Sequence, residues 1–287
     1  MSKDKALIVI TDSVRFVNGF TEGLNGRDLF LSYGKEVIDP SKYELTSFWM
    51  AGGFAARMQR AGLAMRLCAP GQTWLSGLGS SLTGRRIETG VLDEMPADGP
   101  LYAKPAEAKV RGFVSAKYTK QQIEDIYAAE NVPSETILQW SPDILNMNHE
   151  HRFFVANGEI MAGSPYFVDS IVYKAGMTSP FSEEAKSFAL DAIQELKDNQ
   201  PPAFTLDVAR NERTGEWLIV EANPAWSSGL YGCNHAAVMN VLDVACHSTD
   251  ERWLWQPSQY LIDNAAKADL IQVVDHECSA GVMKFEL

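Results

Sequence analysis

The chain has 287 residues, of which 46% are hydrophobic and 22% are charged, and its net charge is −12. This composition excludes a disordered, collagen-like or disulfide-scaffold chain, and the length fits roughly two domains. The negative charge argues against nucleic acid or an anionic membrane as a partner.

The cysteines and the start of the chain indicate where the protein resides. The four cysteines are scattered and form no Cys-x-x-Cys pair: Cys68, Cys233, Cys246 and Cys278. The chain opens with the charged residues MSKDK, unlike a signal peptide, and no apolar stretch approaches the ~20 residues of a membrane span. We therefore expect free thiols and a soluble, cytoplasmic protein.

The first 70 residues predict a small α/β unit. Residues 5–10, KALIVI, have the composition of a short strand. Residues 47–62 place apolar side chains, beginning with Phe48, at helical spacing, and residues 63–70 resemble a second strand that stops at a proline. Strand, helix and strand in this order favour an α/β arrangement.

A loop-rich span separates this unit from the central part of the chain. Residues 101–105 and 113–118 predict strands, and residues 119–130 predict a helix. Thr119 and Gln122 fit a capping box, in which each side chain bonds the backbone N–H of the other residue. The central part is therefore expected to mix strands with a capped helix.

Two β-hairpins and a helix follow. Residues 151–163 predict a hairpin that turns at Asn157-Gly158. An acidic start predicts a helix over about residues 182–197, because negative charge is favourable at a helix N-terminus. A second hairpin is expected around residues 211–215.

The second hairpin carries the most informative stretch, EWLIVEANPAW at residues 216–226. Because side chains alternate along a strand, we expect one face to carry four of its residues: Trp217, Ile219, Glu221 and Asn223. With a three-residue loop ending in a left-handed Gly215, Asp207 on the preceding strand lies opposite Glu221. Carboxylate and amide oxygens that converge in this way suit Mg²⁺, with substrate phosphates as its further ligands.

Other interpretations of these residues stay open. One carboxylate could be solvated or paired with Arg210, and a bulge at the loop would turn Asp207 to the other face. His149 and His151 could bind zinc, although no third nitrogen or sulfur ligand is spaced to complete a tetrahedron.

Cationic side chains precede the acidic hairpin, and a site for Mg²⁺ and a polyphosphate needs such groups. Lys104 ends a predicted strand before Pro105, and Lys109 follows a loop of small residues. Arg152 shares a strand face with Glu150, and an arginine can grip a phosphate at two points. Each of these cations, taken singly, could also be a solvated surface side chain.

Over roughly residues 80–235 the chain resembles the ATP-grasp superfamily, and most closely its small clade named for one arginine and two lysines. The order of segments carries the likeness: GRRIE, AKPAEAK, ILQWSPD, EHRFFVANGEI and FTLDVAR…WLIVEANPAWSSGLYG. The last of them is the most specific, since a strand ending Glu-x-Asn after an Asp on the preceding strand is the superfamily's magnesium signature.

The resemblance implies an α/β (α+β) fold in which a nucleotide is held between two α+β subdomains. A small N-terminal α/β domain would occupy residues 1–70, and the central ATP-grasp subdomain residues 71–136. The C-terminal ATP-grasp subdomain, with the magnesium site, would occupy residues 137–250, and residues 251–287 would form an extension.

The resemblance also implies roles for the acidic hairpin and two cations. Asp207, Glu221 and Asn223 would bind Mg²⁺. Lys104 would contact the α- and β-phosphates of ATP, and Arg152 would contact the transferred phosphate.

Further residues would surround the rest of the nucleotide. Arg86, or alternatively Arg85, occupies the region of the first nucleotide lysine of most relatives, and Lys109 would be the second lysine of the clade. The adenine and ribose would lie near a further set of residues: the backbone of Gln139, Trp140 and Ser141, with Asp143 or Glu150 at the ribose.

By the same resemblance, the protein would be an ATP-dependent carboxylate–amine ligase that forms an amide or peptide bond through an acyl-phosphate. Its partners would be a small-molecule or peptide carboxylate and an amine, with ATP and Mg²⁺ as cofactors. The segments TDSVRF and NPAWSSGLYG are candidates for the acceptor site, with Arg15, Trp226 and Tyr231. A phosphotransferase and a non-catalytic nucleotide-binding module are the alternatives.

The tail after residue 250 leaves two outcomes open. Its aromatic residues, Trp253, Trp255 and Tyr260, either pack on the core of the same chain or are buried against a second subunit. A homodimer is the expectation in the second case.

Overall fold

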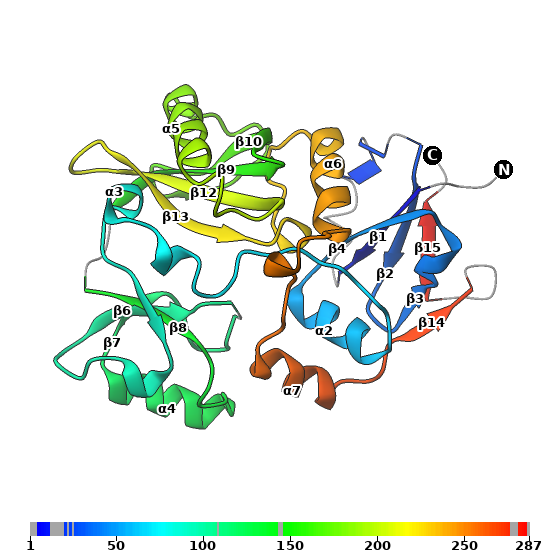
Figure 1. Cartoon of the computed structure of the whole chain (residues 1–287), viewed down its shortest axis with the longest axis horizontal. Coiled ribbons are helices and arrows are strands. Elements are labelled where there is room, and N and C mark those ends of the chain that lie inside the picture. The colour runs from blue at the N-terminus through cyan, green and yellow to red at the C-terminus, as the bar shows by residue number, and fades with distance from the viewer. Residues whose placement is uncertain are drawn as a thin grey trace.

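The computed structural model describes the chain over residues 5–11, 20–21, 23–24, 26–107, 109–142, 146–275 and 281–285. Three of the residues singled out above lie outside these ranges: Arg15, Asp143 and Cys278. Figure 1 shows an N-terminal sheet on the right, a large sheet at upper left and a central sheet at lower left. The three parts meet near the middle of the molecule.

The N-terminal sheet has four strands in the order β15-β2-β1-β4. Their bounds are Val282–Phe285 for β15, Asp28–Ser32 for β2, Lys5–Ile10 for β1 and Leu45–Met50 for β4. β1 is parallel to β2 and β4 and is almost fully buried, as its apolar sequence predicts. Helix α2 (Gly52–Arg60) follows β4, so Phe48 lies in a strand and not in the predicted helix. Residues 63–70 form isolated bridges at Arg66 and Cys68 instead of the predicted strand.

The C-terminal segment packs against the N-terminal part of the same chain. Helix α7 (Gln259–Lys267) lies against α2, strand β14 (Gln272–Val274) pairs with β3 (Glu36–Ile38), and β15 pairs with β2. Ahead of α7, Trp253 in the 3₁₀ turn η6 (Glu251–Trp253) is buried in the core beside α5, and Trp255 is buried in the core of the N-terminal part. Of the two outcomes expected for the tail, packing on the core holds over the described residues, and a homodimer stays a prediction.

The central sheet has the strand order β5-β8-β6-β7. Its strands are β5 (Glu88–Gly90), β8 (Leu138–Ser141), β6 (Leu101–Pro105) and β7 (Ala116–Tyr118). Helix α4 (Lys120–Glu130) packs on this sheet and begins with the predicted capping box at Thr119. Strand β8 pairs with β5 and β6, so the central sheet includes residues up to Ser141, beyond the predicted boundary at residue 136. The division of the chain into domains stays a prediction.

Short helical turns lie between several of the strands. The 3₁₀ turn η2 (Pro40–Lys42) lies between β3 and β4, the turn η3 (Leu75–Gly77) and helix α3 (Ser80–Thr83) precede β5, and the turn η4 (Leu92–Glu94) lies between β5 and β6.

The large sheet has the strand order β11-β10-β9-β12-β13. Its strands are β11 (Ile171–Val172), β10 (Glu159–Val168), β9 (Met147–Ala156), β12 (Ala203–Asn211) and β13 (Trp217–Asn223). Asn157 and Gly158 form the predicted turn between β9 and β10, both with positive φ. One face packs on helix α5 (Ser182–Glu195), and helix α6 (His235–Cys246) lies between this sheet and β4. The 3₁₀ turn η5 (Ala225–Ser227) connects β13 to α6.

The expectations about membrane spans and about the cysteines can be compared with the described residues. Within these ranges, no helix has both the length and the apolar character that crossing a membrane requires. The three cysteines that the structure describes, Cys68, Cys233 and Cys246, are buried free thiols, as predicted.

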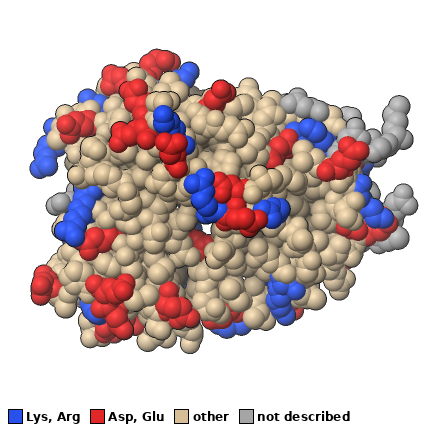
Figure 2. All heavy atoms as spheres, in the orientation of Figure 1, with Lys and Arg blue, Asp and Glu red and all other residues tan. Residues whose placement is uncertain are grey.

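On the face seen in Figure 2, basic side chains lie among acidic ones, and a hollow lies where the three parts meet.

His151 on β9 makes the stability of this fold depend on pH. It is 1% exposed, and burial lowers its pKa to about 4, with His149 contributing in the same direction. The stabilisation from a neutral His151 is present above the unfolded pKa of ~6.5 and is lost as pH falls toward 4. We predict a loss of about 2 kcal/mol between pH 7 and pH 5 from this group, measured by urea unfolding.

The variant His151→Gln tests this prediction, because glutamine is neutral at both pH values. It should remove most of that pH dependence, whereas His247→Gln, at an exposed position, should leave it unchanged. An equal pH dependence in the wild type and in His151→Gln would contradict the assignment.

Candidate active site

The turn of the acidic hairpin is longer than predicted. A backbone hydrogen bond of 2.8 Å from Asn211 N to Glu216 O closes a four-residue loop, one residue longer than expected. Gly215 has the predicted left-handed conformation, with φ of 77°. The longer loop by itself would shift the register and place Asp207 opposite Val220.

A β-bulge at Val220 restores the predicted pairing. On the loop side Val208 pairs with Ile219, and beyond the bulge Asp207 pairs with Glu221. Because the extra residue reverses the alternation, Glu221 lies on the face opposite to Ile219. The prediction of one shared face is therefore wrong for this set: Trp217, Ile219, Glu221 and Asn223.

The bulge lets one strand serve two purposes. Before it, Trp217 and Ile219 join the hydrophobic core beside α5, together with Phe204 of β12. After it, Glu221 and Asn223 face the central sheet's side of the molecule, where they line a cavity. The apolar run that precedes Glu221 is thus core, and the oxygens that follow belong to a site.

Two cations balance the two facing carboxylates. Asp207 is fully buried and receives two hydrogen bonds from Arg152, from Nε to Oδ1 at 2.8 Å and from Nη2 to Oδ2 at 2.6 Å. Lys104 Nζ lies 2.5 Å from Glu221 Oε2 and so connects β6 of the central sheet to β13 of the large sheet. Because like charges directly opposite each other destabilise a ladder, the hairpin depends on these cations.

Asn223 lies between the two carboxylates. Its Nδ2 donates to Glu221 Oε1 at 2.9 Å and lies 3.4 Å from Asp207 Oδ2. A single small atom at this position therefore reaches oxygens of both strands, as a bridging cation must. Two carboxylates and one amide are hard oxygen donors, so this set fits Mg²⁺.

The charge balance also sets the protonation of the site. Burial raises the pKa of Asp207 to about 6 against the opposing charge of Arg152, so Asp207 is mainly ionised at neutral pH. Burial acts on Glu221 as well, but the charge and hydrogen bond of Lys104 outweigh it and lower the pKa to about 2. Both carboxylates are therefore anionic at neutral pH.

A cavity of about 670 Å³ lies between the central and large sheets beside these ion pairs. The central sheet contributes Lys104 and Gln139 to its wall, and the large sheet contributes Glu150, Tyr166 and Glu221. We call this cavity the cleft. Its volume is in the range of small-molecule sites, which are commonly ~300–1,000 Å³.

The rings of two tyrosines also contact the guanidinium group of Arg152. Its guanidinium carbon lies 5.1 Å from the ring centre of Tyr231 and 5.6 Å from that of Tyr166, and the two rings stack on each other. The Tyr166 hydroxyl donates to Glu150. Tyr166 is not among the residues predicted from the sequence, because a tyrosine within a hairpin strand gives no signal that separates it from ordinary strand residues.

A family model for the ATP-grasp domain, describing family 2 of the clade named for one arginine and two lysines, matches residues 82–241, which is more than half of the chain. The chain belongs to this ATP-grasp family. The match spans every predicted metal and phosphate ligand, from Lys104 to Asn223. The resemblance seen in the sequence, including the clade, is confirmed, and so is the mixed α/β (α+β) ATP-grasp fold class.

The comparison with solved structures finds proteins of low sequence identity. No curated protein matches this chain. Two solved structures of D-alanine–D-alanine ligase from Bacillus anthracis are similar to it, one of them complexed with ATP. Their TM-scores are 0.49 and 0.48 at 9% and 11% sequence identity, and each comparison covers 84% of this chain and 97% of the other.

The two adjacent arginines of this ATP-grasp chain lie in different places. Arg85 lines the cleft and is 9% exposed, and burial lowers its pKa. The side chain of Arg86 is 80% exposed, does not line the cleft, and pairs with Glu88 at 2.8 Å. Of the two alternatives left open by the sequence, the structure therefore brings Arg85 and not Arg86 to the cleft.

The other residues predicted to contact the nucleotide also differ in whether they line the cleft. Gln139 lines the cleft, and Lys109 is exposed at its edge. Trp140 is buried in the core beneath the central sheet, and Ser141 is buried without lining the cleft. Asp143 lies outside the described residues, so the ribose candidate within them is Glu150.

The two histidines beside Glu150 do not form a metal site with a third residue. His149 lies 3.5 Å from Asp169 and 3.4 Å from the Ser179 hydroxyl, whereas His151 faces Ser182. Among the described residues, no group of three His, Cys, Asp or Glu side chains is placed to hold a metal ion. The open zinc interpretation therefore finds no support in this part of the chain.

The Asp207–Arg152 pair yields a stability prediction. We predict that Arg152→Met lowers the free energy of unfolding by about 3–5 kcal/mol, because it leaves a fully buried carboxylate without its cation. Urea unfolding at neutral pH measures the loss. Adding Asp207→Asn to this variant should recover a large part of it, and strictly additive losses would contradict the proposed coupling.

Proposed function

We propose that this chain is an ATP-dependent carboxylate–amine ligase. The observation that carries the proposal is the convergence of three oxygen-bearing side chains, Asp207, Glu221 and Asn223, with the cations Lys104 and Arg152. Of these five residues, Lys104, Glu221 and Asn223 line the cleft. Membership of the ATP-grasp family supports ATP as the nucleotide. ATP would lie in the cleft, with its phosphates toward these cations.

The first step would be phosphoryl transfer. A carboxylate oxygen of the substrate attacks the γ-phosphorus of ATP. The bond between the γ-phosphorus and the β,γ-bridging oxygen breaks, so that ADP departs and the substrate becomes an acyl-phosphate. Such transfer needs in-line positioning and neutralisation of charge more than covalent help from the protein. Lys104 and Arg152 are held by hydrogen bonds and aromatic rings, so they present fixed positive charge to the phosphates.

Mg²⁺ fits the donor set described above, and Asp207, Glu221 and Asn223 would hold it. When bound, it would supply charge neutralisation at the phosphate oxygens. In the second step the amine attacks the acyl carbon, the tetrahedral intermediate collapses to an amide, and phosphate leaves with the bonding electron pair. The amine gives up a proton in this step.

The reaction is tested by incubating the protein with ATP, Mg²⁺ and pools of amino acids, and by following ADP and phosphate. Release of both that requires a carboxylate and an amine together supports the ligase. ADP formation with a phosphorylated product would replace the ligase with a phosphotransferase. Tight ATP binding without any turnover would replace it with a nucleotide-binding module.

Glu221→Gln should reduce turnover by at least about 100-fold, because an amide is a weaker magnesium ligand and a weaker partner for Lys104. The matched control is Glu216→Gln, an exposed position just before the same strand, which should keep wild-type turnover. Magnesium-dependent ATP affinity, measured by calorimetry, should fall in the first variant only. Full activity of Glu221→Gln would reject the metal assignment.

Arg85 and Arg86 provide a second matched pair. Arg85→Gln should weaken ATP binding by about 10-fold or more, since a hydrogen bond to a charged group contributes ~1.5–3 kcal/mol. Arg86→Gln should stay within about twofold of the wild type, because its side chain points into solvent. Equal effects of the two changes on ATP affinity would contradict the placement of Arg85 at the nucleotide.

A further inference from the structure

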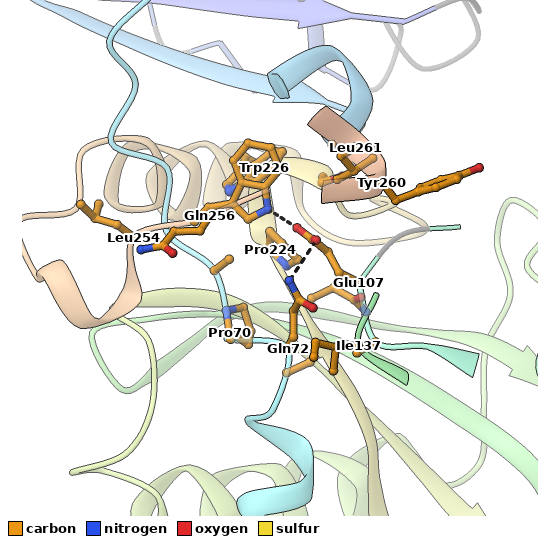
Figure 3. Close-up of a pocket in the computed structure, with 18 of the residues that line it drawn as sticks. Pro70, Gln72, Glu107, Ile137, Pro224, Trp226, Leu254, Gln256, Tyr260 and Leu261 are labelled. Carbon is orange, nitrogen blue, oxygen red and sulfur yellow. Dashed lines mark hydrogen bonds between the residues drawn. The ribbon is translucent and has the colours of Figure 1, made fainter. Parts of the chain in front are cut away.

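A second cavity, of about 880 Å³, lies beside the cleft and is lined in part by the C-terminal segment. We call it the C-terminal pocket, and Figure 3 shows it. Its wall includes Leu254, Tyr260 and Leu261, which lie beyond the residues matched by the family model. The opposite wall is formed by the segment that follows β13, with Pro224 and Trp226.

The C-terminal pocket adjoins the metal end of the cleft. Both cavities are lined by Asn223, which bridges the two carboxylates, and by Glu107 and Gln72. A molecule in the pocket would therefore lie next to the place where the acyl-phosphate of the proposed reaction would form. This is the position required of a second substrate.

The wall of the pocket combines aromatic and aliphatic side chains with polar and charged ones, among them Gln72, Lys109 and Arg252. Trp226 and Trp255 meet edge to face, with ring centres 5.0 Å apart, and Leu261 comes from helix α7. The aromatic and aliphatic part of the wall favours a ligand with an apolar body, because contact with it removes apolar surface from water.

Glu107 brings a carboxylate to the part of the wall beside Trp255. Its carboxylate accepts hydrogen bonds from three neutral donors: Trp255 Nε1 at 2.6 Å, Ser258 N at 2.9 Å and Gln72 Nε2 at 3.3 Å. In Figure 3 it lies between the indole rings and Gln72. Over the described residues, no lysine, arginine or histidine forms an ion pair with it.

The other acidic group of the pocket is already balanced. Glu251 pairs with Arg66 at 2.7 Å, and Arg252 pairs with Asp250. Burial raises the pKa of Glu107, and its hydrogen bonds from Trp255 and Ser258 oppose this shift only in part. The Ser258 hydroxyl also acts on this carboxylate in the same direction as these two donors, and all of the donors are neutral. A cation next to Glu107 would supply the missing charge.

We propose that the C-terminal pocket binds the amine co-substrate as an ammonium ion with an apolar body, and that Glu107 is the group that positions its cationic end. This inference rests on the ligase function proposed above, in which the bound ammonium ion loses one proton to solvent before its nitrogen attacks the acyl carbon. It assigns substrate selection to residues of this chain that lie outside the matched family domain, together with Glu107 from the loop after β6.

The test uses the full-length chain without nucleotide and measures binding by calorimetry. The probes are 2-phenylethylamine, which is a cation at neutral pH, and 2-phenylethanol, which has the same ring and chain without the charge. The wild type should bind the amine at least about 10-fold more tightly than the alcohol, since hydrogen bonds to charged groups contribute ~1.5–3 kcal/mol. Equal affinity for the two probes would overturn the proposal without need of any variant.

Two variants test which carboxylate causes the preference for the amine over the alcohol. Glu107→Gln should lower amine affinity to the level of the alcohol and leave alcohol affinity within about twofold. The matched control Glu251→Gln removes the same charge from the rim of the same pocket and should preserve the preference for the amine. If Glu107→Gln lowers the affinity for both probes equally, Glu107 only holds the loop after β6 against the C-terminal segment, and the proposal fails.

Failure of this inference is distinguishable from failure of the proposed function. If ATP turnover requires a carboxylate and an amine but the wild type shows no preference for 2-phenylethylamine, the ligase stands and the pocket assignment is overturned. If the preference is present and depends on Glu107 but no amide forms, the ammonium site is supported and the ligase is rejected.

Discussion

The candidate site depends on placing two carboxylates opposite each other on adjacent strands. Asp207 and Glu221 would repel one another, and Asp207 is fully buried. Arg152 from the neighbouring strand and Lys104 from a different sheet balance them. The ion pair of Lys104 also joins the two sheets that enclose the cleft, so the same charges that suit a metal and a polyphosphate help to fix the shape of the site.

The bulge at Val220 reconciles the needs of the core with those of the site. Without it, the four-residue loop would place Asp207 opposite Val220 and leave Glu221 on the face of Ile219, beside α5. One extra residue reverses the alternation halfway along β13. Apolar side chains then fill the core at one end of the strand, and oxygen ligands reach the cleft at the other.

The C-terminal segment gives the molecule its second cavity. It returns to the N-terminal sheet through β15, and its helix α7 lies against α2 while Tyr260 packs on the core of the central part. Glu107 joins this segment to the loop after β6 through Trp255 and Ser258. Nucleotide and amine would therefore meet different parts of the chain, which share Asn223 and Glu107 as a common boundary.

The sequence by itself determined the ATP-grasp family and the local elements whose signals lie within a few residues, such as the capped helix α4 and the turn at Asn157-Gly158. It also indicated the pairing of Asp207 with Glu221, although the loop length and the shared face were wrong. Tertiary structure decided which of Arg85 and Arg86 reaches the cleft, because only packing distinguishes two adjacent arginines. It alone revealed Glu107, whose partners lie 35, 148 and 151 residues away in the chain, beyond the reach of any local pattern.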